Sequence, residues 1–167
     1  MLLFALHLVN PFASSYAFAA APPPIVHGST TTQYGQVVTL ISFESRGYGY
    51  NFCSGTLIYE SWVITAAHCA EAFDDNERMG YDQHYVYVGY DLESSSGITD
   101  YAVVESWTPH EKWDGATYAY DIGILELKSP ITSVDPMPVN KDALSSSMEG
   151  EDYRYVGWGI TDDNAQD

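Results

Sequence analysis

The sequence predicts an all-β protein, and two observations support that class. Short runs typical of strands recur between turn-rich stretches, and the composition favours strands, with 14 tyrosines among 167 residues. Helical periodicity is weak throughout, so a single turn at residues 66–70 is the one helical element expected. Regular short strands with turns between them are typical of a β-barrel or a sandwich. The predicted strands span residues 37–43, 50–58, 62–65, 85–89, 101–107 and 122–127.

Turn-rich stretches separate the predicted strands. The turn-rich stretches lie at residues 45–49, 74–82, 93–100 and 109–116. The character of the chain then changes, because residues 129–150 hold Pro130, Pro136, Pro138 and a run of three serines, as linkers between two units do. Residues 153–158 look like one more strand. We therefore expect a first unit at residues 25–128, a linker at 129–150 and the start of a second unit at 151–167.

The first 24 residues predict a secretory leader and a short pro-segment outside the fold. Residues 1–21 are apolar and end in three alanines, which resembles a signal-peptidase site. Polar residues interrupt the run, which makes it a poor membrane span. No lysine or arginine precedes it, so an upstream start and a disordered tail both stay open. We expect a secreted protein with a signal peptide and a short pro-segment at residues 1–24.

The charge balance is strongly acidic. Six Lys+Arg stand against 23 Asp+Glu, a formal net charge of −17. Such a surface repels phosphate backbones and anionic lipid, so nucleic acid and membranes are excluded as partners. Two readings of the acidity stay open, an ordinary solvated secreted protein and adaptation to a saline environment. We expect a monomer that acts on a protein or peptide substrate.

Cysteine and histidine spacing predicts a disulfide and no metal site. Cys53 and Cys69 are the only cysteines, and a secreted context permits a bond between them. No CxxC or HExxH pattern is present, so we expect no metal and no cofactor. Two weaker metal hypotheses were weighed, calcium in the acidic loop and a histidine site with His68. Their ligands would be Asp91, Glu93 and Asp100, and His27, His84 and His110, respectively.

Two segments carry candidate chemistry. In residues 62–69 a buried strand runs into small residues and then His68, and the following Cys69 can be tied back to Cys53. A histidine held at a strand end is a natural general base, because imidazole titrates near neutrality. Asp121 stands immediately before an alternating apolar strand. Its carboxylate could accept the imidazole N–H and fix the tautomer, or it could be a solvated turn residue.

Five segments resemble the landmarks of the trypsin/chymotrypsin-type serine protease family, in the family's order. Residues 65–69 (TAAHC) are similar to the histidine box, and 121–125 (DIGIL) to the aspartate box. Residues 53–58 (CSGTLI) look like the strand that holds the disulfide partner. Residues 25–28 (IVHG) resemble the mature N-terminus, and 155–159 (YVGWG) the first strand of a second barrel. The resemblance covers nearly all of residues 25–167.

The resemblance implies a chymotrypsin-like double antiparallel β-barrel, with the first barrel complete and the second only begun. It implies that His68 is the general base and acid, that Asp121 orients it, and that Cys53 pairs with Cys69. Ile25 would be the mature N-terminus of a zymogen. The implied function is a secreted serine endopeptidase that hydrolyses peptide bonds with a Ser-His-Asp triad.

The sequence departs from the family pattern in two places. It contains no Gly-Asp-Ser-Gly-Gly segment and no Gly-x-Ser-x-Gly elbow. We therefore expect the nucleophile and oxyanion hole beyond Asp167, and this chain alone to be inactive. Pro24 precedes Ile25, where zymogens carry a basic residue, and His27 replaces a glycine, so activation would need a different protease or would not free Ile25.

Two other functions were weighed against the endopeptidase. The first is a catalytically inactive protease homologue that acts as a binding module, which the absent serine favours. An intact His68 and Asp121 argue against it, because an inactive protein has no chemical need for either. The second is a short protein of one barrel and a tail, which would leave apolar strand edges exposed.

Overall fold

The computed structural model describes residues 28–159 except for residues 93, 95 and 144, so the predicted leader and Ile25 lie outside the described residues. All six predicted strands are present, with ends shifted by up to three residues. The elements are β1 (Val37–Phe43), β2 (Gly49–Tyr59), β3 (Trp62–Thr65), α1 (Ala67–Met79), β4 (Gln83–Gly89), β5 (Ile98–Pro109), β6 (Gly123–Leu127) and the short 3-10 helix η1 (Ser146–Met148).

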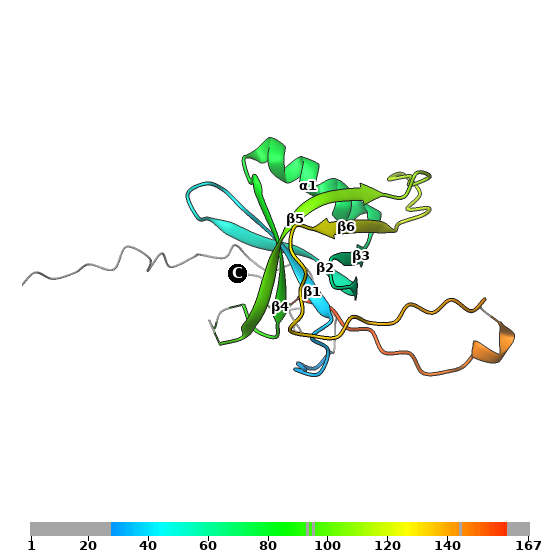
Figure 1. The fold of residues 1–167 in the computed structure, drawn as a ribbon. Coiled ribbons are helices and arrows are strands. Elements are labelled where there is room, and N and C mark those ends of the chain that lie inside the picture. The colour runs from blue at the N-terminus through cyan, green and yellow to red at the C-terminus, as the bar shows by residue number, and fades with distance from the viewer. Residues whose placement is uncertain (1–27, 93, 95, 144, 160–167) are drawn as a thin grey trace, which may run out of the picture.

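The strands close into a barrel in the order β1-β2-β3-β6-β5-β4, and every pairing is antiparallel (Figure 1). Closure removes the free edges that an open sheet would present. The prediction of an all-β protein with one complete barrel is confirmed. β3 leads directly into α1, which packs against β5 and β6. The helix therefore starts at the end of β3, which lies beside the start of β6.

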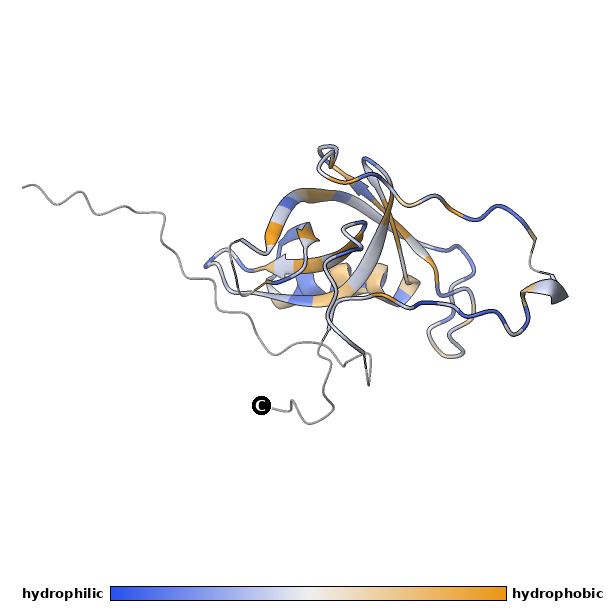
Figure 2. Ribbon diagram, turned by 90° about the horizontal axis from the view of Figure 1, so that it is seen from below, coloured by the Kyte–Doolittle hydropathy of each residue, from blue (hydrophilic) through white to orange (hydrophobic). Residues whose placement is uncertain are grey.

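Side chains alternate between the barrel interior and its surface. β6 shows the pattern clearly, with Gly123, Leu125 and Leu127 buried and the residues between them exposed. Figure 2 shows the hydrophobic stretches concentrated in the barrel strands. Phe73 of α1 joins the same core and is fully buried. The core cluster consists of Val38, Leu40, Leu57, Val63, Cys69, Phe73, Val86, Val88, Ala102, Val104, Leu125, Leu127 and Ile131.

Helix α1 is longer than the single turn predicted at residues 66–70, and it replaces most of the turn predicted at 74–82. It has 13 residues and ends at Gly80, whose φ of 94° is the left-handed conformation that favours glycine. Its buried positions include Phe73 and also the polar Asn76. A polar residue at a core position interrupts the apolar period, so sequence periodicity underestimates the helix.

The strand predicted at residues 153–158 is absent. The segment forms no ladder among the described residues, because the six barrel strands already pair with one another on both sides. Trp158 nevertheless lies against the barrel, where its backbone N–H donates to Ser54 Oγ at 2.7 Å and its indole Nε1–H donates to the Val37 carbonyl at 2.9 Å. In the described part of the chain, no helix has the length and apolar character to cross a bilayer.

Candidate active site

The fold brings His68 and Asp121 together across 53 residues of sequence. β3 and β6 are neighbours, with Thr65 opposite Gly123, so the residues that follow β3 and precede β6 meet at one end of the barrel. His68 is the second residue of α1, and Asp121 lies in the connection that enters β6. Strand pairing therefore places the two side chains in reach of each other.

Asp121 binds both the ring and the backbone of His68. Its Oδ2 lies 2.8 Å from Nδ1 of the imidazole, and its Oδ1 accepts the His68 backbone N–H at 3.0 Å. An ionised carboxylate can only accept, so the neutral imidazole carries its proton on Nδ1. The other nitrogen, Nε2, then has a free lone pair. The His68 side chain is half exposed, so part of the imidazole ring is open to solvent.

The carboxyl of Asp121 is held in its ionised form. Burial by itself raises its pKa, but hydrogen bonds from the backbone N–H and the ring of His68, the charge of that ring, and the Ala67 N–H outweigh burial, and the pKa is lowered. The two backbone donors belong to the first turn of α1, whose Ala66 N-cap supplies no side-chain acceptor. Asp121 therefore also satisfies orphan donors at the helix N-terminus, where an anion is favoured.

Small residues allow α1 to approach β6 closely. A Cβ placed on Gly123 would lie 3.0 Å from Ala70 Cβ and 3.1 Å from the Ala66 carbonyl oxygen. A larger side chain at position 123 would push the helix away from the strand. Gly123 is thus a residue on which the distance between His68 and Asp121 depends.

The predicted disulfide is confirmed. Cys53 of β2 is bonded to Cys69 of α1, which ties the first turn of the helix to the barrel. His68 Nε2 lies 3.4 Å from Cys69 Sγ. Among the described residues, the potential metal ligands that cluster are Cys53, His68 and Cys69, but both sulfurs are used in the disulfide. This trio therefore offers no thiolate to a metal.

Two aromatic residues flank His68 that the sequence does not assign to the site: Trp113, which it predicts to be a core or loop-anchoring residue, and Tyr118. Trp113 and Tyr118 come from the loop between β5 and β6, with ring centroids 6.5 Å and 6.2 Å from the imidazole. The Tyr118 backbone has a φ of 56°, an uncommon conformation for a bulky residue. The sequence offers one signal that Tyr118 could lie near the site, because Tyr118 shortly precedes Asp121 in the loop between β5 and β6.

The other histidines lie apart from this pair. His84 is buried in the barrel, where Nδ1 lies 2.9 Å from Ser42 Oγ, and His110 stacks on Tyr120. Neither joins His68 in a cluster of potential ligands, and His27 lies outside the described residues. In the acidic loop, Asp100 accepts the Tyr101 backbone N–H, and Glu93 lies outside the described residues.

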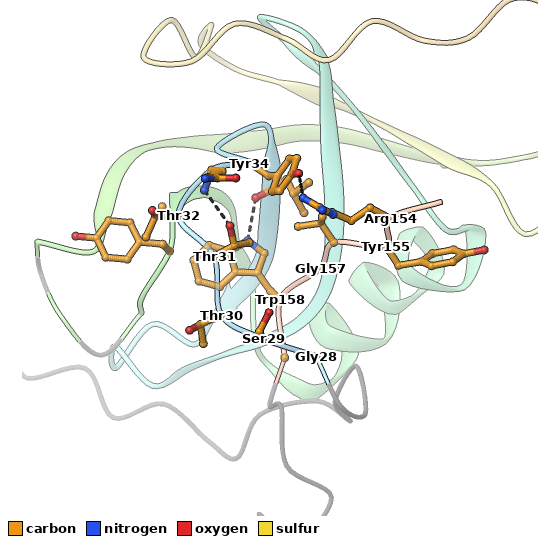
Figure 3. A pocket seen from close by; sticks show the side chains of 16 residues that line it. Gly28, Ser29, Thr30, Thr31, Thr32, Tyr34, Arg154, Tyr155, Gly157 and Trp158 are labelled. Atoms are coloured by element: carbon orange, nitrogen blue, oxygen red, sulfur yellow. Dashed lines mark hydrogen bonds between the residues drawn. The ribbon is translucent and has the colours of Figure 1, made fainter. Parts of the chain in front are cut away.

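A pocket of about 540 Å³ lies away from the pair. It is formed between residues 28–34 and residues 154–159 (Figure 3). Arg154 Nη1 donates to the Tyr34 hydroxyl at 2.6 Å on its wall, and Trp158 closes another side. Neither His68 nor Asp121 lines it, so the pocket is separate from the candidate chemistry.

Comparisons with known proteins agree on one family. The family model described as Trypsin matches residues 25–167. Human chymotrypsin-like elastase family member 1 is 29% identical over 133 residues, which are 75% of this chain and 48% of that protein. Trypsin 5G1 of Aedes aegypti is 36% identical over 117 residues, 66% of this chain and 39% of that protein. The chain thus spans less than half the length of these curated relatives.

Solved structures support the same fold. The structure of HL collagenase matches with a TM-score of 0.53 at 18% identity, over 71% of this chain and 48% of that one. The structure of GrC matches with a TM-score of 0.57 at 18% identity, over 72% of this chain and 52% of that one. The family model covers most of the chain, and the fold agrees with it. The chain belongs to the trypsin/chymotrypsin-type serine protease family.

Proposed function

We propose that the protein is a secreted serine endopeptidase in which His68 is the general base and Asp121 orients it. The observation that carries the proposal is the pair of hydrogen bonds from His68, through Nδ1 and its backbone N–H, to the two carboxylate oxygens of Asp121. Family membership supports peptide-bond hydrolysis as the reaction and protein or peptide chains as substrates.

The geometry suits proton transfer at Nε2. Asp121 keeps the proton of the neutral ring on Nδ1, so Nε2 can take the proton of a serine hydroxyl as that oxygen attacks a peptide carbonyl. The resulting imidazolium is stabilised by the carboxylate 2.8 Å away. In the second half of the step, Nε2 gives the proton to the leaving amine. Asp121 needs no proton of its own, which agrees with its lowered pKa.

In this proposal the nucleophilic serine lies in the second barrel, beyond Asp167. Among the described residues, no serine hydroxyl makes a hydrogen bond with His68 Nε2, whose neighbour is Cys69 Sγ. Residues 151–167 would begin the second barrel, after a first barrel at 25–128 and a linker at 129–150. Trp158 contacts Ser54 and Val37, so the segment that would begin the second barrel packs against the first one.

Covalent labelling of the full-length protein tests the proposal. A fluorophosphonate probe reacts with a serine hydroxyl only when a neighbouring base activates it. The full-length protein should be labelled on one serine, and His68→Ala should abolish labelling while His110→Ala leaves it intact. Labelling that survives His68→Ala would refute the assigned role. A folded full-length protein that is never labelled, even after its chain has been cut before Ile25, would instead favour the inactive homologue that acts as a binding module.

A further inference from the structure

Four polar side chains, three of them buried and Tyr50 half-buried, form hydrogen bonds between the second half of α1 and the barrel, away from the candidate catalytic pair. They are Ser42 of β1, Tyr50 of β2, Asn76 of α1 and His84 of β4. Ser42 is fully buried, Asn76 is 2% exposed and His84 is 5% exposed. Buried polar groups cost free energy unless they are hydrogen-bonded. We call these four residues the His84 network.

The hydrogen bonds of the His84 network have a fixed direction. The Tyr50 hydroxyl donates to Asn76 Oδ1, so the amide nitrogen faces Ser42 and donates to its Oγ at 2.9 Å. The Ser42 hydroxyl proton is then available for His84 Nδ1, also at 2.9 Å. Every group in this series is satisfied only if Nδ1 is an unprotonated acceptor. His84 is therefore neutral in the closed network, with its proton on Nε2.

The other side of the His84 ring is enclosed by α1 and β5. Phe73 and Trp107 pack against it edge to face, with centroids 4.9 Å and 5.1 Å away. Nε2 is buried without a hydrogen-bond partner, 3.7 Å from Oε1 of the half-exposed Glu77. The charged groups that act on the ring are Glu77 and Asp74 of α1 and Asp82, just before β4. Those facing it from β1 and β5, Ser42 and Trp107, are uncharged.

Acid opposes the closed arrangement. A second proton on the ring would sit on Nδ1 and face the Ser42 hydroxyl proton, so that hydrogen bond would be lost or reversed. Burial lowers the pKa of His84, and attraction to Glu77, Asp82 and Asp74 offsets only part of that effect. An open network, like the unfolded chain, therefore binds the proton more readily. Closure is favoured above about pH 6.5, the ordinary pKa of histidine, and weakens as the pH falls through the lowered value.

We propose that the His84 network is an acid-sensitive anchor that fastens the second half of α1 to the barrel; the first turn of the same helix carries His68. Asn76 supplies the helix side of the anchor, and the three barrel strands supply the rest. The first turn has its own attachment through Cys69 and Asp121, so acid loosens the far half of α1 first. The anchor does not depend on the proposed function.

Hydrogen exchange measured by mass spectrometry on the full-length protein tests the anchor. Protection of the amides of residues 73–79 is compared at about pH 7.5 and about pH 5, corrected for intrinsic rates and referenced to β6. The wild type should lose protection in α1 by about fivefold at the lower pH, the change that one lost hydrogen bond of ordinary strength produces. His84→Asn keeps an amide acceptor at the position of Nδ1 for Ser42 but does not titrate, so it should remove this loss. His110→Asn should behave as wild type.

Two results would overturn the anchor: equal corrected protection at both pH values in the wild type, or an undiminished loss in His84→Asn. If His84→Asn does not fold, Glu77→Gln gives the answer. The Glu77 carboxylate raises the pKa of His84, so its removal should shift the loss of protection to lower pH. An unshifted transition would contradict the proposal. These exchange measurements need no peptidase activity, so failure of the anchor and failure of the proposed function are distinguished.

Discussion

Replacement of Phe73 by alanine should destabilise the barrel more than any surface change on α1. The side chain is fully buried, and its ring lies 5.0 Å from Phe52, 5.0 Å from Trp107 and 4.9 Å from His84. Three rings from different strands cannot all collapse into the space that it leaves. A buried Phe→Ala change costs about 3–5 kcal/mol, and for a barrel of this size the thermal midpoint should fall by about 15–30 °C.

Urea unfolding followed by circular dichroism measures this cost. Met79→Ala is the matched control, because Met79 lies on the same helix and is 63% exposed, so it should change the free energy of unfolding by less than about 0.5 kcal/mol. An unchanged slope of the unfolding free energy against urea concentration would show that the unfolded state is the same in both variants. If Phe73→Ala stayed within about 1 kcal/mol of wild type, the packing of α1 described here would be wrong.

Three further predictions concern the first turn of α1 and the barrel. Joint replacement of Cys53 and Cys69 by serine opens a loop with a sequence separation of 16 and should cost about 3 kcal/mol in urea unfolding; a cost near zero would contradict the role of the disulfide. The lowered pKa of Asp121 means that the unfolded chain takes up the proton first as acid is added. The stability that the ionised Asp121 carboxylate gives the folded chain is present above about pH 4 and is lost as the pH falls through its folded-state pKa. The thermal midpoint of Asp121→Asn should accordingly fall less steeply below about pH 4 than that of wild type. An identical fall of the midpoint with pH in both proteins would contradict the lowered pKa of Asp121. Gly89→Ala places a Cβ 2.1 Å from the Gly97 carbonyl oxygen, so it should lower the free energy of unfolding in urea by about 1–3 kcal/mol. An unchanged free energy of unfolding would show that the loop holding Gly97 moves to make room for the methyl group.

Much of the barrel and of the candidate site could be predicted because the relevant signals are local. Alternation of buried and exposed residues, as in Gly123–Leu127, places each strand. The disulfide was predictable because a chain with two cysteines has one possible pair. Strand pairing brings His68 and Asp121 together in the structure. In the sequence, the family resemblance indicated this pair, and residue spacing did not.

The features that the sequence did not reveal depend on tertiary contacts. Helix α1 extends through Asn76 because Tyr50 and Ser42 satisfy that buried amide, and neither is near it in sequence. Tyr118 reaches His68 because of a left-handed backbone conformation that no local pattern encodes. Residues 153–158 have the composition of a strand but no partner among the described strands, since a strand needs an open edge.

Hydrolysis of a peptide substrate by the full-length protein tests the central claim most directly. The measurement is kcat/KM for the wild type, for His68→Ala and for His110→Ala as the matched histidine control. With His68 as the general base, His68→Ala should lower kcat/KM by at least about 10³-fold, and His110→Ala should leave it within a few fold. Activity that survives His68→Ala would contradict the assignment of His68 as the base.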